Sequence, residues 1–297
     1  MTTNETPRYH VPESSPWPIL GAIGLFTTAI GAVNFIQQSS DIVANEGTIP
    51  GGFVLTLGLS IIIFMMFGWW RSTIVESITG MNSPMLDRSY REGMMWFITS
   101  EVMFFAAFFG ALFYVRHMSV PWLGGASNNA MTHLYLWPDF LPQWPLTTTP
   151  GGETTGAIGP WGLPLVNTII LLTSSITVTI AHHALIAGNR LNLILGLAAT
   201  VALGATFLNF QIEEYVHLYH EVGLTMGSGI YGSTFFLLTG FHGMHVTIGT
   251  IMLAVMLFRS IKGHFSKENH FAFEATAWYW HFVDVVWLGL FIFVYIL

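Results

Sequence analysis

The chain of 297 residues has no cysteine and little charge. The absence of cysteine excludes disulfides, thiolate metal sites and thiol catalysis. Charged residues make up 8% of the sequence, against roughly 25% in soluble domains, and the only lysines are Lys262 and Lys267. A retinal-binding protein needs a membrane-buried lysine for its Schiff base. Both lysines lie between predicted spans, so that class is not expected.

Apolar residues dominate the rest of the sequence. They make up 53% of the chain, and the mean hydropathy is +0.59, values typical of a polytopic membrane protein. No polar block is long enough to form a soluble domain, so one membrane domain over residues 1–297 is predicted. Residues 1–18 lack the basic start and short apolar core of a cleaved signal peptide. We expect them to remain in the mature chain.

Seven segments reach the roughly 20 mostly apolar residues that a spanning helix needs. The predicted fold is therefore an all-α integral membrane protein with seven transmembrane helices. The segments are Trp17–Ile36, Gly51–Ile74, Gly93–Val115, Leu163–Ala187, Leu191–Ile212, Ile230–Phe258 and Ala275–Leu297. Only the residues GNR separate the fourth segment from the fifth, which predicts antiparallel neighbours.

Basic residues orient the predicted spans. Eight of the nine lie on the N-terminal side of the membrane, and Arg116 alone lies opposite. An excess of arginine and lysine marks the cytoplasmic side, so the N-terminus is predicted inside and the C-terminus outside. The longest connection, residues 116–162, contains WPDFLPQWPLTTTPGGETTGAIGPWG. It is predicted to be an irregular outer loop with its tryptophans at the headgroup level.

Ionisable residues inside the predicted spans are candidates for function. The last span carries Glu274, His281 and Asp284, so either this helix faces other protein or it carries protons. Glu101 lies near the middle of the third span, with no basic residue within two turns. Its carboxyl group is predicted to be protonated or hydrogen-bonded to a neighbouring helix. Two roles stay open: a proton site or gate, and a neutral contact that joins helices.

Histidines occur in pairs at residues 182–183, 217–220 and 242–245. His242 and His245 share a face of the sixth span, where they could ligate a metal or haem. We favour interhelical hydrogen bonds, because a subunit that holds redox metals would need several such pairs at matched membrane depth. The glycines of the same span predict a tightly packed helix. They are Gly232, Gly240, Gly243 and Gly249.

Two spans end in aromatic or basic residues at the predicted inner interface. Trp69, Trp70 and Arg71 close the second span, and Arg259 closes the sixth. Such residues are ordinary interface anchors. The sharper interpretation is a bound anionic phospholipid headgroup.

Six strings extend over nearly the whole chain. They are SPWPILGA, WWRSTIVES, REGMMWFITSEVMFFAAFF, AHHALIAGNR, GIYGSTFFLLTGFHGMHVTIG and HFAFEATAWYWHFVDVVWL. Together they closely resemble subunit III of the cytochrome c oxidases, in the haem–copper oxidase family. Subunit III of a quinol oxidase is similar but shorter, and the two N-terminal spans favour the cytochrome c enzyme. A proton-coupled transporter that uses Glu101 and Asp284 is a more distant alternative.

The resemblance implies a subunit that holds no cofactor of its own. Family members form a two-helix bundle, here within residues 1–75, and a five-helix bundle, here residues 91–297, around a V-shaped cleft filled with lipid. They pack against subunit I, with subunit II in the same complex, and these partners hold the haem and copper that reduce oxygen to water. The expected location is the bacterial plasma membrane or the mitochondrial inner membrane, and no nucleic-acid partner is expected.

The resemblance also implies roles for single residues, none of them catalytic or metal-ligating. The expected phospholipid ligands are Trp70, Arg71, Glu76 and Arg259. Glu101 matches the family's buried glutamate, and with Asp284 it is a candidate for a proton or oxygen path. Such a subunit is expected to support proton uptake and the working life of the enzyme. His10 is a candidate proton-collecting residue at the inner surface, because histidine exchanges protons at physiological pH.

Overall fold

The computed structural model describes residues 14–39, 50–81 and 83–297. Within these ranges the regular elements are helices, with one isolated β-bridge between Thr148 and Thr154. Seven helices of the described part are long and apolar enough to span a membrane. The predicted all-α fold with seven transmembrane helices is confirmed. His10 lies outside the described residues.

The chain divides into two compact units, residues 1–90 (unit 1) and residues 91–297 (unit 2). Unit 1 contains the hairpin of α1 (Trp17–Ser39) and α2 (Gly51–Ile78). The two helices approach closely at glycines: a Cβ added at Gly31 or at Gly58 would overlap the backbone of the opposite helix. Hydrogen bonds also join them, from Trp17 Nε1 to Ser72 Oγ at 3.2 Å and from Gly51 N–H to Gln38 Oε1 at 2.7 Å.

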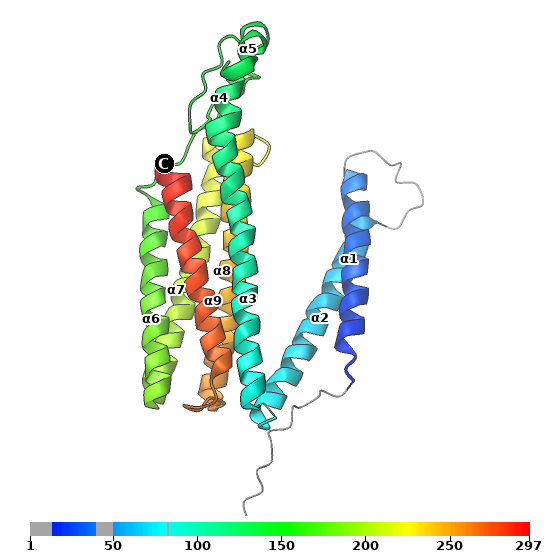
Figure 1. Ribbon diagram of the computed structural model, residues 1–297, viewed down its shortest axis with the longest axis vertical. Helices are drawn as coiled ribbons and strands as arrows, with labels where there is room; N and C mark the ends of the chain where they lie inside the picture. Colours follow the sequence, from blue (N-terminus) through cyan, green and yellow to red (C-terminus); the bar gives the residue numbers. More distant parts are fainter. Residues whose placement is uncertain (1–13, 40–49, 82) are drawn as a thin grey trace, which may run out of the picture. The chain divides into compact units, whose positions relative to one another are not determined.

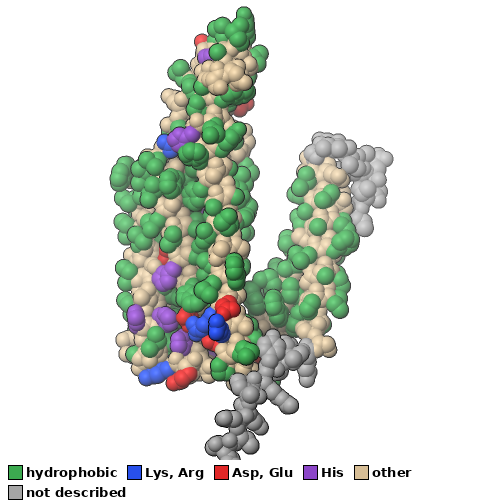
Figure 2. Space-filling model, in the orientation of Figure 1, with side chains coloured by type: hydrophobic (Ala, Val, Ile, Leu, Met, Phe, Trp, Pro, Cys, Tyr) green, Lys and Arg blue, Asp and Glu red, His purple; other side chains and the backbone are tan. Residues whose placement is uncertain are grey.

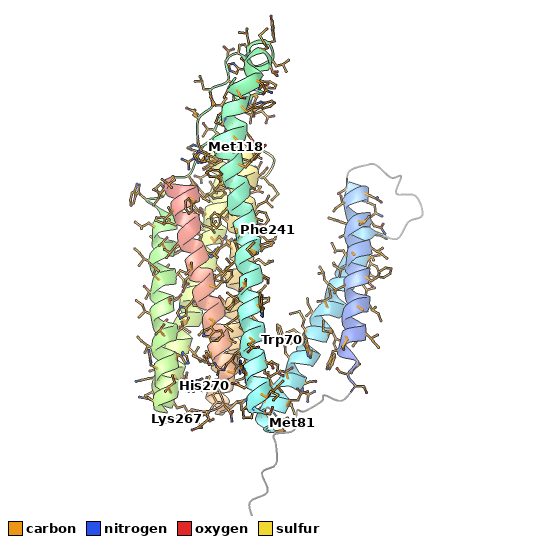
Figure 3. The ribbon with its side chains drawn as sticks, viewed as in Figure 1. Trp70, Met81, Met118, Phe241, Lys267 and His270 are labelled. Atoms are coloured by element: carbon orange, nitrogen blue, oxygen red, sulfur yellow. The ribbon has the colours of Figure 1, made fainter. Side chains whose placement is uncertain are left out.

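Unit 2 contains most of α3 (Pro84–Tyr114) and four further long helices, which run in alternating directions (Figure 1). These are α6 (Leu163–Ala187), α7 (Arg190–His217), α8 (Ile230–Lys262) and α9 (Phe271–Leu290). We call the end of unit 2 with the connections 188–189 and 263–270 the basic end. The opposite end, with residues 115–162, 218–229 and Leu297, is the extension end. Lysine, arginine and acidic side chains gather near the basic end (Figure 2), where Lys267 and His270 lie (Figure 3).

Helix α3 does not stop where its membrane span was predicted to stop. It continues through the π-helical turn η1 (Val115–Ser119) into α4 (Val120–Leu123). At 1.5 Å per residue, the path from Pro84 to Leu123 is about 60 Å long, twice the roughly 30 Å of a hydrocarbon core. The rod therefore stands beyond the other helices at the extension end (Figure 1).

The prediction of an irregular loop over residues 116–162 is wrong for its first half. After α4, the 3-10 turn η2 (Ser127–Asn129) and α5 (Ala130–Leu136) are also helical. The segment VRHMSVPWL contains no glycine, and its proline, Pro121, comes shortly after the π-helical turn η1. Residues 137–162 contain no helix, as predicted.

Helix α9 is the most buried of the spanning helices in the described part, with 61% of its most apolar window buried. Its fully buried Trp280 and Trp287 donate indole hydrogen bonds to Ser174 Oγ and Thr168 Oγ1 of α6, each at 2.9 Å. The last span therefore faces protein, which was one of the two alternatives for its ionisable residues. It continues into the π-helical turn η4 (Phe291–Ile296).

The glycines of α8 bear out the predicted tight packing. A Cβ added at Gly243 would lie 2.7 Å from the amide of Gln211 on α7. One added at Gly249 would lie 2.8 Å from the ring of Trp280 on α9. Helix α8 thus packs closely against α7 at Gly243 and against α9 at Gly249, where a larger side chain would overlap the neighbouring helix.

Candidate functional site

Glu101 and His245 join α3 to α8 through a polar contact. The Oε2 atom of Glu101 lies 2.9 Å from Nε2 of His245, whose side chain is 6% exposed. Glu101 shares its helix face with Phe104, Phe105 and Phe108, which follow at spacings of three, four and seven residues. Sequence analysis left two roles open for Glu101, and the contact that joins helices is present.

One proton lies between these two groups. Nδ1 of His245 is 2.6 Å from the carbonyl oxygen of Phe241, and a carbonyl oxygen only accepts, so Nδ1 carries a hydrogen. Nε2 then either accepts a hydrogen bond from a protonated Glu101 or, as part of an imidazolium, donates one to the carboxylate. In both states the pair has no net charge, which suits a site inside a membrane.

Aromatic rings enclose the pair. The Phe105 ring meets the imidazole of His245 edge-on at 5.0 Å between centroids, and Tyr279 stacks on it at 6.3 Å. Phe104 packs edge-on against Phe241 of α8 at 5.0 Å. These rings exclude water from one side of the pair, which strengthens its hydrogen bond relative to one in solvent.

A second contact holds α3 at the basic end of unit 2. Arg91 Nη1 donates to Glu274 Oε2 of α9 at 2.6 Å, and its guanidinium lies 5.1 Å from the centroid of the Phe271 ring. Glu274, one of the three ionisable residues of the last span, therefore has a cationic partner. This ion pair is partly solvated, because the two side chains are 34% and 17% exposed.

Asp284 and His281, also on α9, face α6. His281 Nδ1 lies 2.7 Å from Ser175 Oγ and 3.8 Å from Asp284 Oδ2. Asp284 is 4% exposed, and neither of its carboxyl oxygens has a hydrogen-bond partner among the described residues. A carboxyl group in that position suits the neutral, protonated form, because the carboxylate would lack donors.

His242 makes an interhelical contact, as His245 does. Its Nε2 lies 3.2 Å from the carbonyl oxygen of Val283 on α9, so a neutral ring donates there. The favoured interpretation of this pair as interhelical hydrogen-bonding groups is confirmed. In the described part of the chain, no three His, Cys, Asp or Glu side chains are grouped so that they could hold a metal ion.

The expected phospholipid ligands are distributed over both units. In unit 1, Arg71 and Glu76 line a pocket of about 310 Å³ together with Trp17 and Ser72, whereas Trp70 is 41% exposed and does not line it. In unit 2, Arg259 is 7% exposed, and its guanidinium lies 4.6 Å from the centroid of the Phe265 ring. Its Nε atom is buried without a hydrogen-bond partner among the described residues.

Helix α7 carries polar contacts that were not predicted from the sequence. Tyr295 of η4 donates to Glu214 Oε1 at 2.8 Å, and Gln211 Nε2 donates to the carbonyl oxygen of Thr239 at 2.8 Å. The predicted span ended at Ile212, which placed Glu214 outside the membrane and removed it from consideration. The signal in the sequence was the run QIEE, polar residues directly after an apolar span.

Comparison with known proteins assigns these helices to a family. A family model described as Cytochrome c oxidase subunit III matches residues 7–297. The chain belongs to this family. Cytochrome c oxidase subunit 3 of Marchantia polymorpha is 41% identical over 296 residues, which cover 99% of this chain and 98% of that protein.

Two animal members of the cytochrome c oxidase subunit III family are similarly close. The protein of Formosania lacustris is 44% identical over 289 residues, covering 97% of this chain and 96% of its own length. The protein of Hippopotamus amphibius is 40% identical over 294 residues, which cover 99% of this chain and 98% of that protein. With seven helices in its described part that are long and apolar enough to span a membrane, the chain is a multi-pass membrane subunit of an oxidoreductase complex.

Proposed function

We propose that this chain is the subunit of a cytochrome c oxidase that supports catalysis without a redox centre of its own. It packs against subunit I, with subunit II in the same complex, and these partners hold the haem and copper that reduce oxygen to water and drive proton pumping. The chain sustains proton uptake by subunit I and the working life of the enzyme. The family match along residues 7–297 carries this proposal.

The proposed orientation has the basic end of unit 2 and the N-terminus inside, and the C-terminus outside. The arginines and lysines that favour it are Arg88, Arg91, Arg190, Arg259, Lys262 and Lys267. The membrane is the bacterial plasma membrane or the mitochondrial inner membrane. His10, at the N-terminus, is then the proposed proton-collecting residue of the inner surface.

The test compares the oxidase purified with and without this chain. Removal is expected to slow turnover at high pH, where proton supply limits the rate, and to reduce the number of turnovers before inactivation. His10→Ala should reproduce part of the loss at high pH, with His220→Ala at the extension end as its control. If removal changed neither quantity, a role in assembly alone would remain.

Glu101 and Asp284 are proposed to be protonated carboxyl groups at neutral pH, on a path for protons or oxygen. The Nδ1 hydrogen of His245 is compatible with a Glu101 hydroxyl that donates to Nε2, and the carboxyl oxygens of Asp284 have no hydrogen-bond partner among the described residues. Infrared difference spectra should show a protonated carboxyl band that disappears in Glu101→Gln. A carboxylate band assigned to Glu101 at pH 7 would contradict this.

Each unit is proposed to bind a phospholipid headgroup. Arg71 has no ion-pair partner among the described residues, and the buried Nε of Arg259 lacks an acceptor, so an anionic phosphate suits both. Trp70 and Glu76 complete the proposed set in unit 1. Arg71→Ala and Arg259→Ala should each remove lipid from the purified complex, measured by mass spectrometry, while Arg116→Ala should not. Unchanged lipid content in both variants would overturn the assignment.

Two other functions are tested by simple observations. A quinol oxidase containing this chain would oxidise quinol and not cytochrome c when purified, although the relatives named above are cytochrome c oxidase subunits. A proton-coupled transporter would take up solute when the chain alone is reconstituted in liposomes, and the proposed function predicts no such uptake.

A further inference from the structure

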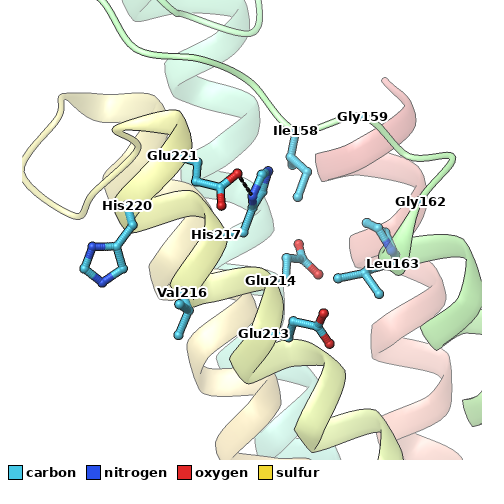
Figure 4. A pocket seen from close by; sticks show the side chains of 11 residues that line it. Ile158, Gly159, Gly162, Leu163, Glu213, Glu214, Val216, His217, His220 and Glu221 are labelled. Carbon is cyan, nitrogen blue, oxygen red and sulfur yellow. Dashed lines mark ion pairs between the residues drawn. The ribbon is translucent and has the colours of Figure 1, made fainter.

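A pocket of about 470 Å³ opens at the extension end of unit 2 (Figure 4). It lies between the start of α6 and the end of α7, with the π-helical turn η3 (Leu218–Val222) at its rim. Its apolar wall comes from Ile158, Leu163, Pro164 and Val216.

The other lining side chains are acidic or histidine. Glu213 is exposed and has no hydrogen bond or ion pair with the described residues. Glu214 is 1% exposed; its Oε1 accepts from Tyr295, and its Oε2 is buried without a partner. Glu221 lies in η3, farther along the same wall of the pocket, and is paired with His217 at 2.9 Å (Figure 4). No lysine or arginine lines the pocket, so its carboxylates lack a strong cation.

The start of α6 borders the same pocket. The first turn of a helix has free N–H groups and a partial positive charge, which favours ionised carboxylates nearby. Gly162, Leu163 and Pro164 place that turn beside Glu213 and Glu214. The exposed Glu213 and Glu221 therefore give the pocket negative charge, and the buried Glu214 adds a carboxyl group whose Oε2 atom has no donor among the described residues.

The lining decides which cation fits. A bare metal ion is not favoured, because no three of the described His, Asp or Glu side chains are grouped to hold one. A quaternary ammonium would be expected among aromatic rings, and the lining contains no Phe, Tyr or Trp. A primary ammonium instead has N–H donors for carboxylate oxygens, and its carbon atoms suit the apolar wall.

We propose that this pocket binds the primary ammonium group of a small organic cation between Glu213 and Glu214, with its carbon atoms against Leu163 and Val216. The group comes either from the headgroup of an aminophospholipid or from a free soluble amine. The inference is independent of the proposed function, since it rests on this pocket alone.

The first test titrates the purified, intact oxidase with ethanolamine at constant ionic strength. We expect saturable binding, at least tenfold weaker in Glu213→Gln and in Glu214→Gln. Glu213 is exposed, so its variant tests the site without disturbing the Tyr295 contact. Glu268→Gln, an exposed glutamate at the basic end, is the matched control and should bind normally. Choline, which lacks N–H donors, should bind at least tenfold more weakly.

The second test identifies the source of the ammonium group. The oxidase is placed in nanodiscs of phosphatidylethanolamine or of phosphatidylcholine, and bound lipid is counted by native mass spectrometry. Phosphatidylethanolamine retained by the wild type and lost in Glu213→Gln supports a lipid headgroup. Ethanolamine binding without such retention supports a soluble amine. Equal binding of choline and ethanolamine, or no binding with no lipid selectivity, would overturn the proposal.

Discussion

Two helix contacts of the molecule use different groups. One is the contact between α1 and α2, and the other is the contact of α3 with α8 and α9. In unit 1, Gly31 and Gly58 let two backbones meet, and hydrogen bonds cross the interface near its ends, from Trp17 to Ser72 and from the Gly51 N–H to Gln38. In unit 2, α3 is held by long side chains: phenylalanine rings, the Glu101–His245 pair and the Arg91–Glu274 pair. Lipid is as apolar as these helices, so association requires close packing or polar contacts. The α1–α2 contact relies mainly on close packing, and the contact of α3 with α8 and α9 relies mainly on aromatic and polar side chains.

The glycine contact should be the most sensitive to substitution. Gly31→Leu adds a side chain whose Cβ already overlaps the backbone of Leu55, so α1 and α2 must separate at a cost of about 3 kcal/mol or more. The chain has no cysteine, so Thr27→Cys and Ser60→Cys provide the only sites for spin labels within this chain. The distance between the labels in the purified oxidase should increase and broaden.

Gly110→Leu in α3 is the control for that substitution. No atom lies within 4 Å of a Cβ added at Gly110, so this change should leave the complex as stable as the wild type. An unchanged label distance in Gly31→Leu would show that the hairpin does not depend on close approach.

The Glu101–His245 pair should have an intermediate effect. Glu101→Leu leaves the buried Nε2 of His245 without a partner, which costs roughly 1–3 kcal/mol. Adding His245→Phe to Glu101→Leu should recover part of the lost stability, because the unpaired imidazole nitrogen is then removed. The measurement is the thermal denaturation midpoint of the chain in the purified oxidase. If the effects of the two single substitutions simply add, the groups are not coupled.

The Arg91–Glu274 pair should have the smallest effect. It is partly exposed, and exposed ion pairs contribute roughly 0–1 kcal/mol, so Glu274→Gln should lower stability only slightly. The difference from the wild type should shrink as salt rises, whereas that for Glu101→Gln should stay constant. A salt-independent effect of Glu274→Gln would place this pair in the same class as Glu101–His245.

Local features of the fold were predictable, and distant pairings were not. Hydropathy located the seven spans, and the short GNR connection predicted that α6 and α7 are antiparallel neighbours. The ends of α3 and α7 were missed because hydropathy reports the hydrocarbon layer, while these helices continue beyond it. Glu101 was identified as needing a partner, but spacing along one helix cannot select His245, which is 144 residues away.

The single proton shared by Glu101 and His245 also makes the pair insensitive to membrane voltage. Moving one elementary charge across the whole membrane changes its energy by about 2.3 kcal/mol for each 100 mV of membrane potential. The pair is neutral as a whole, and a proton that moves between atoms 2.9 Å apart crosses at most about a tenth of a 30 Å layer, worth roughly 0.2 kcal/mol. A change in the voltage across the membrane therefore leaves this contact between α3 and α8 unchanged.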